Sequence, residues 1–273
     1  SQDQVALVVD ETGLTYLKTG DPLGRELLID RLPDLYRLGT PAGHYLAADL
    51  DRLRRHRVLL FTTSFAPDRK QREAVESLKG DGRTLVFFYT QGVYGADGAP
   101  DSDAMSRFTG IDLELRTDPL SLQARFRGDH PWTAGLRDET YGSPRPVSPY
   151  AVAADVGAEV LAELPDGSPA VVVKRHPDWT AVHCALPGLP REVLVKIVED
   201  AGIHRYLETP DVVWACRDLL GVSVNRAGER LLHLPEPARV RDLDTGEMLP
   251  VANRTFRATF TEKNTRVFRI DPE

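Results

Sequence analysis

The sequence predicts an α/β fold: a parallel β-sheet of the flavodoxin-like or class I glutamine amidotransferase-like kind, with helices on both faces, followed by a small antiparallel β-sandwich. Two observations predict it. Up to residue 89, apolar runs alternate with segments of helical spacing, which is typical of parallel βαβ units. From residue 208 on, short strand-like runs follow at close spacing and no helical pattern remains. We therefore expect two domains, residues 1–207 and 208–273.

The strands of the first half are continuous apolar runs, because a parallel sheet is covered on both faces. They are expected at Val5–Asp10, His44–Leu46, Val58–Thr63 and Thr84–Tyr89. A helical segment, Gly24–Gly39, lies between the first two, and Pro33 is expected to kink or break it. Gly39 is expected to end it. A second helix is expected over Pro67–Lys79, where the proline suits a first helical turn.

The middle of the chain is less regular. Gly92–Asp101 is expected to be a loop, and Gly142–Pro149, with its three prolines, a turn or linker. Helices are expected near residues 102–108 and at Arg191–Ala201. Strands are expected at Asp112–Arg116, Leu120–Phe126, Tyr150–Ala154, Glu159–Leu164, Pro169–Lys174 and Thr180–Ala185. The sandwich strands are expected at Val212–Cys216, Leu219–Asn225, Arg230–Leu234, Arg239–Asp242, Phe256–Phe260 and Arg266–Ile270.

Composition excludes several classes of partner. The 34 Lys and Arg against 41 Asp and Glu give a net charge of −7, which argues against nucleic acid binding. Apolar runs such as Val58–Phe61 are far shorter than the roughly 18 residues of a membrane helix, so no membrane partner is expected. No signal peptide is visible, and two cysteines in no metal spacing fit a reducing compartment. We expect a cytoplasmic protein. Its opening residue, Ser1, indicates processing or a piece of a longer protein.

No cofactor or metal is expected, because Gly-rich phosphate fingerprints and paired His or Cys motifs are absent from the sequence. Ligands of open parallel sheets bind at the carboxyl ends of the strands, where polar residues follow each predicted strand. One aromatic residue, whose face suits a sugar as well as a core, joins these candidates. The candidate binding residues are Asp10, Glu11, Ser64, Gln91, Tyr94 and Trp132.

None of these residues is assigned a catalytic role. Asp10 and Glu11 are adjacent and would point to opposite faces of a strand, so a helix cap and a solvated turn are the alternative. Ser64 lacks the G-x-S-x-G turn that exposes a nucleophile, and its alternative is a residue that enters a helix. Core packing is the alternative for Trp132, as it is for Trp179 and Trp214.

Several segments, in this order, are similar to the C-terminal part of the glycoside hydrolase family 42 β-galactosidases. They are Val5–Asp10, His44–Leu53 running into Val58–Phe65, Gln71–Tyr89, Met105–Ile111 and Ala201–Tyr206 running into the β-rich tail. The resemblance implies an amidotransferase-like trimerisation domain followed by a small β-sandwich. The catalytic barrel of that family needs about 250 residues of its own and has no counterpart here, so no catalytic glutamate is carried over. No cysteine nucleophile occupies the turn after Tyr89.

Two functions follow as hypotheses. The resemblance implies a non-catalytic module that self-associates, as a homotrimer, and walls or organises the active site of a sugar hydrolase. Its partner would be a catalytic barrel in the same chain or in another one. The alternative is a stand-alone small hydrolase or carbohydrate-binding protein that uses the carboxyl edge of the sheet around Ser64, Asp10, Glu11 and Tyr94. A convergent group of these side chains in one pocket would favour the alternative.

Overall fold

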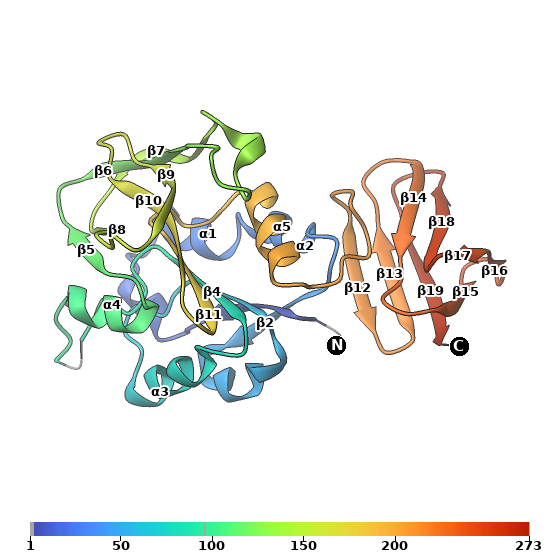
Figure 1. Ribbon diagram of the computed structural model, residues 1–273, viewed down its shortest axis with the longest axis horizontal. Helices are drawn as coiled ribbons and strands as arrows, with labels where there is room; N and C mark the ends of the chain where they lie inside the picture. The colour runs from blue at the N-terminus through green and yellow to red at the C-terminus, as the bar shows by residue number, and fades with distance from the viewer. Residues whose placement is uncertain (1–2, 96, 273) are drawn as a thin grey trace.

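The computed structural model describes residues 3–95 and 97–272, and places them in a large α/β body and a smaller β-sandwich (Figure 1). The body is built on one nine-stranded sheet, ordered β2-β1-β3-β4-β11-β10-β9-β6-β7. In that order the strands are Ala42–Leu46, Val5–Val9, Val58–Phe61, Arg83–Phe88, Trp179–Cys184, Pro169–Arg175, Glu159–Glu163, Leu120–Phe126 and Thr140–Val147. The first five are parallel and the rest pair antiparallel. The predicted parallel sheet is therefore one half of a mixed sheet.

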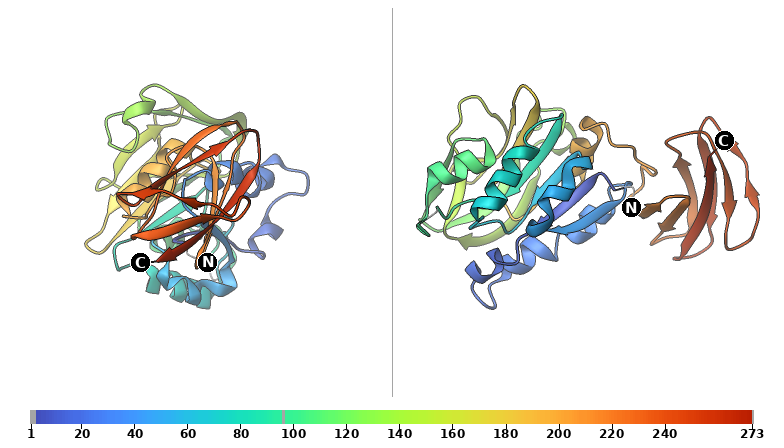
Figure 2. Two further views of the ribbon diagram at one scale, coloured as in Figure 1. Left: turned by 90° about the vertical axis from the view of Figure 1, so that its right-hand side faces the viewer. Right: turned by 90° about the horizontal axis from the view of Figure 1, so that it is seen from below.

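Helices cover both faces of the parallel half, as predicted (Figures 1 and 2). One face packs against α1 (Pro22–Leu28), α2 (Leu32–Tyr36) and α5 (Arg191–Asp200), and the other against η2 (Ala47–Arg55), α3 (Arg69–Leu78) and α4 (Ser102–Thr109). Along β1, Val5 and Leu7 belong to the first of these cores, while Ala6 and Val8 belong to the second. This alternation is what a continuous apolar strand provides when both faces are covered.

Local signals explain the helix boundaries. The predicted helix over Gly24–Gly39 is broken into α1 and α2, and Pro33 lies in the first turn of α2. Asp68 caps α3 through a reciprocal capping box with Gln71. Gly39 does not end α2 as a cap. Its φ is +78°, and a Cβ there would lie 1.9 Å from the carbonyl oxygen of Leu207, so the glycine permits close contact with the linker to the sandwich.

The prediction of a turn or linker at Gly142–Pro149 is wrong, because most of this segment belongs to strand β7. Three prolines argue against a central strand, since proline cannot donate to the ladder. β7 lies at the edge of the sheet, where only one side pairs, and an irregularity between Ser121 and Leu122 shifts its register with β6. An edge position thus tolerates a composition that is typical of loops. Close by, β5 (Leu113–Arg116) and β8 (Tyr150–Ala153) form a separate two-stranded sheet.

The C-terminal part is an antiparallel sandwich of two sheets, ordered β12-β13-β19-β15-β16 and β14-β18-β17. Its strands are Val212–Cys216, Leu219–Ser223, Thr265–Pro272, Ala238–Asp242 and Met248–Leu249 in the first sheet, and Gly228–His233, Thr255–Phe260 and Val251–Ala252 in the second. The six predicted strands are all present. β16 and β17 were not predicted, because two residues each are too few to show a pattern.

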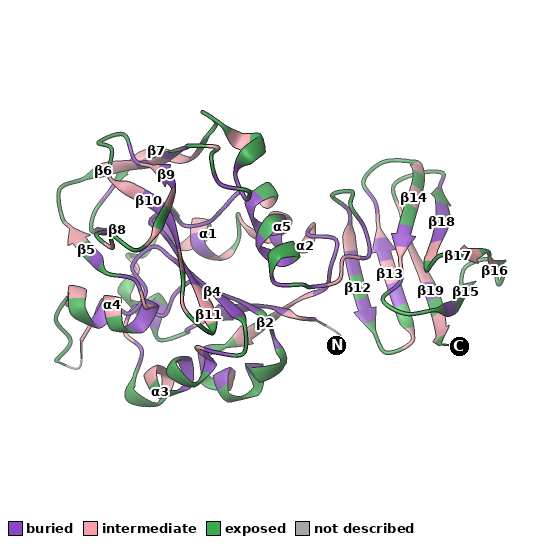
Figure 3. Ribbon diagram, in the orientation of Figure 1, coloured by how far each residue is buried: buried purple, intermediate pink, exposed green. Residues whose placement is uncertain are grey.

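The sandwich has a hydrophobic core of its own, formed by buried residues between Tyr206 and Phe268 in the sequence. Figure 3 shows buried and exposed stretches alternating along its strands. The backbone of Tyr206 is hydrogen-bonded to both the α/β body and the sandwich. The N–H of Tyr206 donates to the carbonyl of Gly39 at 2.7 Å, and the N–H of His233 donates to the carbonyl of Tyr206 at 2.9 Å. That residues 1–207 and 208–273 fold as separate units stays a prediction.

No helix among the described residues is long and apolar enough to cross a membrane, and α3 and α5 have ten residues each.

Candidate functional site

The carboxyl edge of the parallel strands brings several of the candidate residues close together. The hydroxyl of Thr63, after β3, accepts a hydrogen bond from the N–H of Asp10 at 2.9 Å and donates to its carbonyl at 3.0 Å. The side chain of Gln91, after β4, accepts from the N–H of Ser64 at 2.6 Å and donates to two backbone carbonyls. Gln91 is fully buried. It therefore ties the turns after β3 and β4 together and does not face a ligand.

Ser64 is not activated as a nucleophile. Its hydroxyl is buried and has no hydrogen-bond partner among the described residues. His183 lies on β11, which β4 separates from β3, and is fully buried with its Nε2 3.1 Å from the carbonyl oxygen of Ala151. Burial lowers its pKa to about 4. A nucleophile needs a base within hydrogen-bonding distance. The described residues at this edge provide no such pair, so the hydrolase alternative gains no support.

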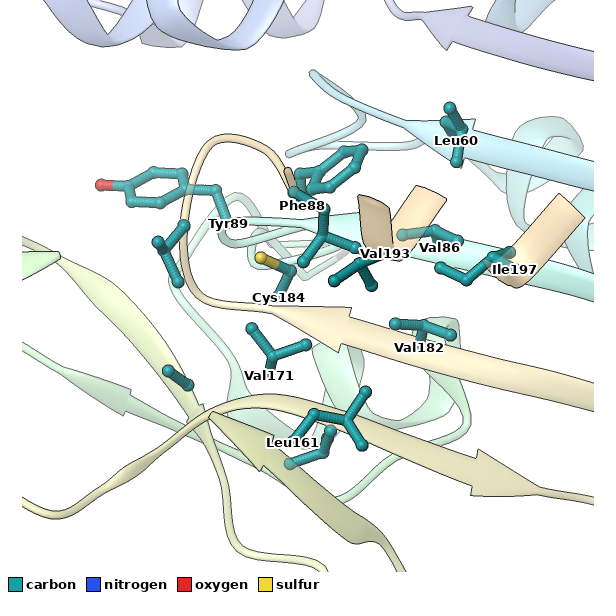
Figure 4. Packing of buried hydrophobic residues seen from close by; sticks show 14 of the residues in the cluster. Leu60, Val86, Phe88, Tyr89, Leu161, Val171, Val182, Cys184, Val193 and Ile197 are labelled. Atoms are coloured by element: carbon teal, nitrogen blue, oxygen red, sulfur yellow. The ribbon is translucent and has the colours of Figure 1, made fainter. Parts of the chain in front are cut away.

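The turn after β4 keeps an unusual backbone. Tyr89, directly after the strand, has a φ of +65°, a conformation that costs a bulky residue free energy. Its side chain is buried, and its hydroxyl donates to the carbonyl oxygen of Pro149. Burial raises the pKa of this phenol further above its usual value. The residue at the strained turn is thus an un-ionised tyrosine, shown at the border of the core in Figure 4.

Asp10 lies at a cavity of about 340 Å³ between the end of β1, η2 and the first turn of α3, which we name the Asp10 cavity. Asp10 as a whole is only 2 % exposed. Its Oδ1 accepts from the N–H of Thr12 at 3.1 Å, whereas its Oδ2 has no hydrogen-bond partner among the described residues. Burial raises the pKa of Asp10, and the nearby charge of Asp68 adds to the rise. The backbone N–H groups of Thr12 and Gly13 and the side-chain amide of Gln71 oppose it. Glu11 lies at the exposed rim.

Tyr94 lies at a different cavity of about 250 Å³, which we name the tyrosine cavity. Its ring packs against that of Tyr16, with the two centroids 4.5 Å apart and the planes inclined by 31°. Tyr16 is 44 % exposed. Lys18, Asp21 and Tyr89 also line this cavity, so aromatic faces and charged groups occur together there. Such a lining is suited to a sugar, which offers both hydroxyl groups and apolar C–H faces.

Trp132 does not lie at this edge, which corrects the prediction. It is 4 % exposed, and its ring packs edge-on against His130 and beneath the guanidinium of Arg175. Arg175 ends β10, which runs antiparallel to β11, so this contact lies at the amino edge of the parallel strands. Trp132 is a core residue. Of the other two tryptophans, Trp179 is stacked on His176 and Trp214 is 50 % exposed on β12.

Sequence reasoning missed a buried polar network at the amino edge. The hydroxyl of Tyr45 donates to Oδ2 of Asp3 at 2.5 Å, and Nε2 of His56 lies 3.2 Å from that hydroxyl and 3.4 Å from the same carboxylate oxygen. A cavity of about 530 Å³ lies beside Asp3, with Arg57 and, from the sandwich, Pro235 in its lining. These residues come from separate turns and strands, so no motif could have indicated them. Within the described ranges, no group of three or more His, Cys, Asp or Glu side chains is arranged to hold a metal ion.

Comparisons with known proteins show the fold. No family model and no curated protein matches the sequence. Among solved structures, a β-galactosidase from Bacillus circulans sp. alkalophilus matches with a TM-score of 0.71 and 17% identity, over 99% of this chain and 42% of that one. A catalytic mutant of a GH42 β-galactosidase from G. stearothermophilus matches with a TM-score of 0.69 and 16% identity, over 99% of this chain and 40% of that one.

An α-L-fucosidase isoenzyme 2 from Paenibacillus thiaminolyticus also matches, with a TM-score of 0.60 and 11% identity, over 99% of this chain and 49% of that one. The chain thus spans less than half the length of each of these three structures. The likeness covers both the α/β body and the sandwich in their order along the chain. At such identities it is a likeness of fold, since unrelated functions share folds.

Proposed function

We propose that this chain is a non-catalytic accessory module of a β-galactosidase-type glycoside hydrolase. One observation carries the proposal: the match extends over 99% of this chain but only about 40% of the GH42 β-galactosidases. This chain therefore corresponds in length to one part of those enzymes and not to the whole of them. We assign residues 1–207 to an amidotransferase-like trimerisation domain and residues 208–273 to the following sandwich.

The local chemistry supports a module without catalysis. The strand order β2-β1-β3-β4-β11 corresponds to the 2-1-3-4-5 order of flavodoxin-like sheets. In amidotransferase-like sheets the turn that corresponds to the one after β4 carries a cysteine. Here the same turn holds the buried Tyr89, whose hydroxyl is engaged by Pro149. The geometry of such a turn is therefore retained without a nucleophile.

The module would act by assembling subunits and by forming part of the wall of a sugar-hydrolase active site. A homotrimer with interfaces on the order of 2,000 Å² or more would suit such a permanent role. The catalytic barrel would lie in the same chain or in a partner. The two free cysteines fit the cytoplasm, which we propose as the compartment.

Light scattering coupled to size exclusion, over a hundredfold range of concentration, tests this function. The expected mass is about three times the 30.3 kDa of one chain, and it should stay constant on dilution. The same samples should not hydrolyse nitrophenyl β-galactoside. A monomer at every concentration that also fails to bind a GH42 barrel would overturn the assembly role. Hydrolysis by the purified chain would overturn the absence of catalysis.

A second function, carbohydrate binding, is favoured by one observation: the paired rings of Tyr16 and Tyr94 at the tyrosine cavity. A titration of the protein with galactose, followed by saturation-transfer NMR, tests this second function. Tyr16→Ala removes an exposed ring, so the fold should persist while sugar binding is lost. Tyr36→Ala, which removes a ring stacked on His44 elsewhere, is the matched control and should bind normally. Equal binding by both variants would rule out the tyrosine cavity.

A further inference from the structure

We propose that the Asp10 cavity binds a small organic ligand through a primary ammonium group. The proposal concerns a site that the accessory function does not require, and it stands or falls independently of that function. It starts from Asp10, a residue that is 2 % exposed and whose Oδ2 has no hydrogen-bond partner in the described part of the chain. A buried carboxylate oxygen without a donor is costly, and a ligand that brings a donor would remove that cost.

The charges around the cavity favour a cation. Its lining contains four carboxylates, those of Asp10, Glu11, Asp51 and Asp68, and one ammonium, that of Lys70. Lys70 Nζ lies 3.9 Å from Asp51 Oδ2, and Asp68 already accepts from the N–H of Gln71 at 2.7 Å. Glu11, Asp51 and Asp68 are exposed and their remaining oxygens can bind water. Asp10 is buried, so it is the carboxylate that gains most from a donor on a ligand. An anionic ligand would be repelled by this lining.

The floor of the cavity favours an organic cation over a metal ion. Its buried apolar residues are Ala47 and Leu50 of η2 and Ala74 of α3. These methyl and isobutyl groups can pack against a carbon skeleton but cannot coordinate a metal. No group of three or more His, Cys, Asp or Glu side chains that could hold a metal was found among the described residues. The volume of about 340 Å³ lies at the lower end of the range for small-molecule sites.

Two kinds of molecule offer this chemistry, an amino sugar and an aliphatic diamine. The experiment is isothermal titration of the full chain carrying Tyr16→Ala, which removes the sugar binding proposed for the tyrosine cavity, with galactosamine, galactose and putrescine at a pH where the amines are protonated. Galactosamine and galactose differ by one amino group in place of a hydroxyl. We expect saturable binding of at least one amine and at least about tenfold weaker binding of galactose, since a charge-assisted hydrogen bond is lost. Binding by galactosamine alone identifies an amino sugar, and binding by putrescine alone identifies a diamine.

Variants place the binding in the cavity. Asp10→Asn keeps an oxygen for the N–H of Thr12 and removes the charge, so it should weaken amine binding at least about tenfold. Ala48→Trp should block the cavity from its exposed rim without altering any carboxylate. Asp118→Asn changes the net charge equally at an exposed turn outside the cavity and should bind as the parent does.

The proposal is overturned if no amine binds, if galactose binds as tightly as galactosamine, or if Asp10→Asn and Ala48→Trp bind amines as the parent does. None of these outcomes bears on the accessory function, which is tested by the mass in solution and by galactoside hydrolysis. A monomeric protein that fails to bind a GH42 barrel but binds an amine in this cavity would overturn the assembly role and support the amine site. A trimer that binds no amine would support the assembly role and overturn the amine site.

Discussion

Two places at the same sheet edge, the end of β1 and the turn after β4, treat their polar groups in opposite ways. After β4, the strained turn is filled by the ring of Tyr89, and its hydroxyl and the amide of Gln91 are bonded to backbone carbonyls. After β1, the carboxyl of Asp10 is equally buried but keeps one oxygen without a partner beside a cavity. The turn after β4 has the strained backbone that is typical of reactive sites, but its polar groups are buried and hydrogen-bonded as in a protein core. The end of β1 has the chemistry of a binding site.

The difference teaches that position in a fold does not by itself indicate function. Both places lie where ligands of open α/β sheets bind. Only the hydrogen bonds of the individual side chains distinguish a residue that holds the turns together from one that is available to a ligand. Four variants should break or sharpen this comparison, and they are described from the largest expected effect to the smallest.

Gly13→Ala should have the largest effect, because it disturbs the contact between the loop after β1 and the end of β3. A Cβ at Gly13 would lie 1.6 Å from the carbonyl oxygen of Thr63, so the backbone must move. We expect a loss of about 3 kcal/mol in the free energy of unfolding, measured by urea denaturation. Gly135→Ala is the control, since nothing lies within 4 Å of its added Cβ. Equal stability of both variants would contradict the close approach.

Tyr89→Phe should have the next largest effect. It leaves the strained backbone unchanged but removes the donor to the carbonyl oxygen of Pro149. We expect a loss of about 1–2 kcal/mol in the same denaturation experiment, because the carbonyl loses its partner in a largely buried site. Tyr36→Phe, which removes an exposed hydrogen bond to His44, should cost less. A larger loss for Tyr36→Phe would show that the bond at the turn contributes little.

Asp10→Asn should raise the melting temperature at pH 7 by a few degrees. Burial raises the pKa of Asp10 in the folded protein, so ionisation of this carboxyl disfavours folding as pH rises through that pKa. Asparagine has no charge to bury. The gain should shrink as pH falls toward the ordinary pKa of an aspartate, where the native carboxyl is protonated in both states. A gain that stays constant with pH would contradict the role of ionisation.

Asp155→Asn should change the melting temperature at pH 7 in the opposite direction. Burial opposes ionisation of Asp155, but the hydrogen bond from Lys174 at 2.5 Å and backbone N–H groups outweigh it and lower the pKa. The ionised form therefore stabilises the fold above the unfolded pKa, and this contribution is lost as pH falls through the folded pKa. The variant should melt at a lower temperature at pH 7, and the deficit should shrink in acid. Melting curves from pH 3 to 8 compare the two aspartates directly.

Much of the fold could be predicted from residue patterns. Apolar runs identified the strands around Val58–Phe61 and Arg83–Phe88, and the Asp68 capping box lies at the start of the predicted helix over Pro67–Lys79. The edge strand β7 could not be predicted in this way, because its prolines are tolerated only where one side of the strand stays unpaired. The mixed character of the sheet also depends on pairing between distant strands, which no local pattern records.

The candidate site could be predicted only in part. That Asp10, Ser64 and Gln91 meet at one edge follows from strand order. Topology does not determine the distances between individual groups. These distances decide that the side-chain amide of Gln91 is hydrogen-bonded to backbone groups, while Oδ2 of Asp10 has no partner among the described residues. Trp132 was placed wrongly because its loop follows an antiparallel strand, and the direction of that strand decides which edge the loop reaches.

By itself, the sequence determined the βα order of the first half, the strand-rich tail and the lack of a cysteine after Tyr89, since these depend on periodicity and residue identity alone. The tertiary structure decided the rest. Burial and hydrogen bonding between segments far apart in the chain turned Tyr89 and Gln91 into structural residues and left Asp10 beside an open cavity. The physical reason is that the state of a polar group depends on its neighbours in space, and those are set only when the chain folds.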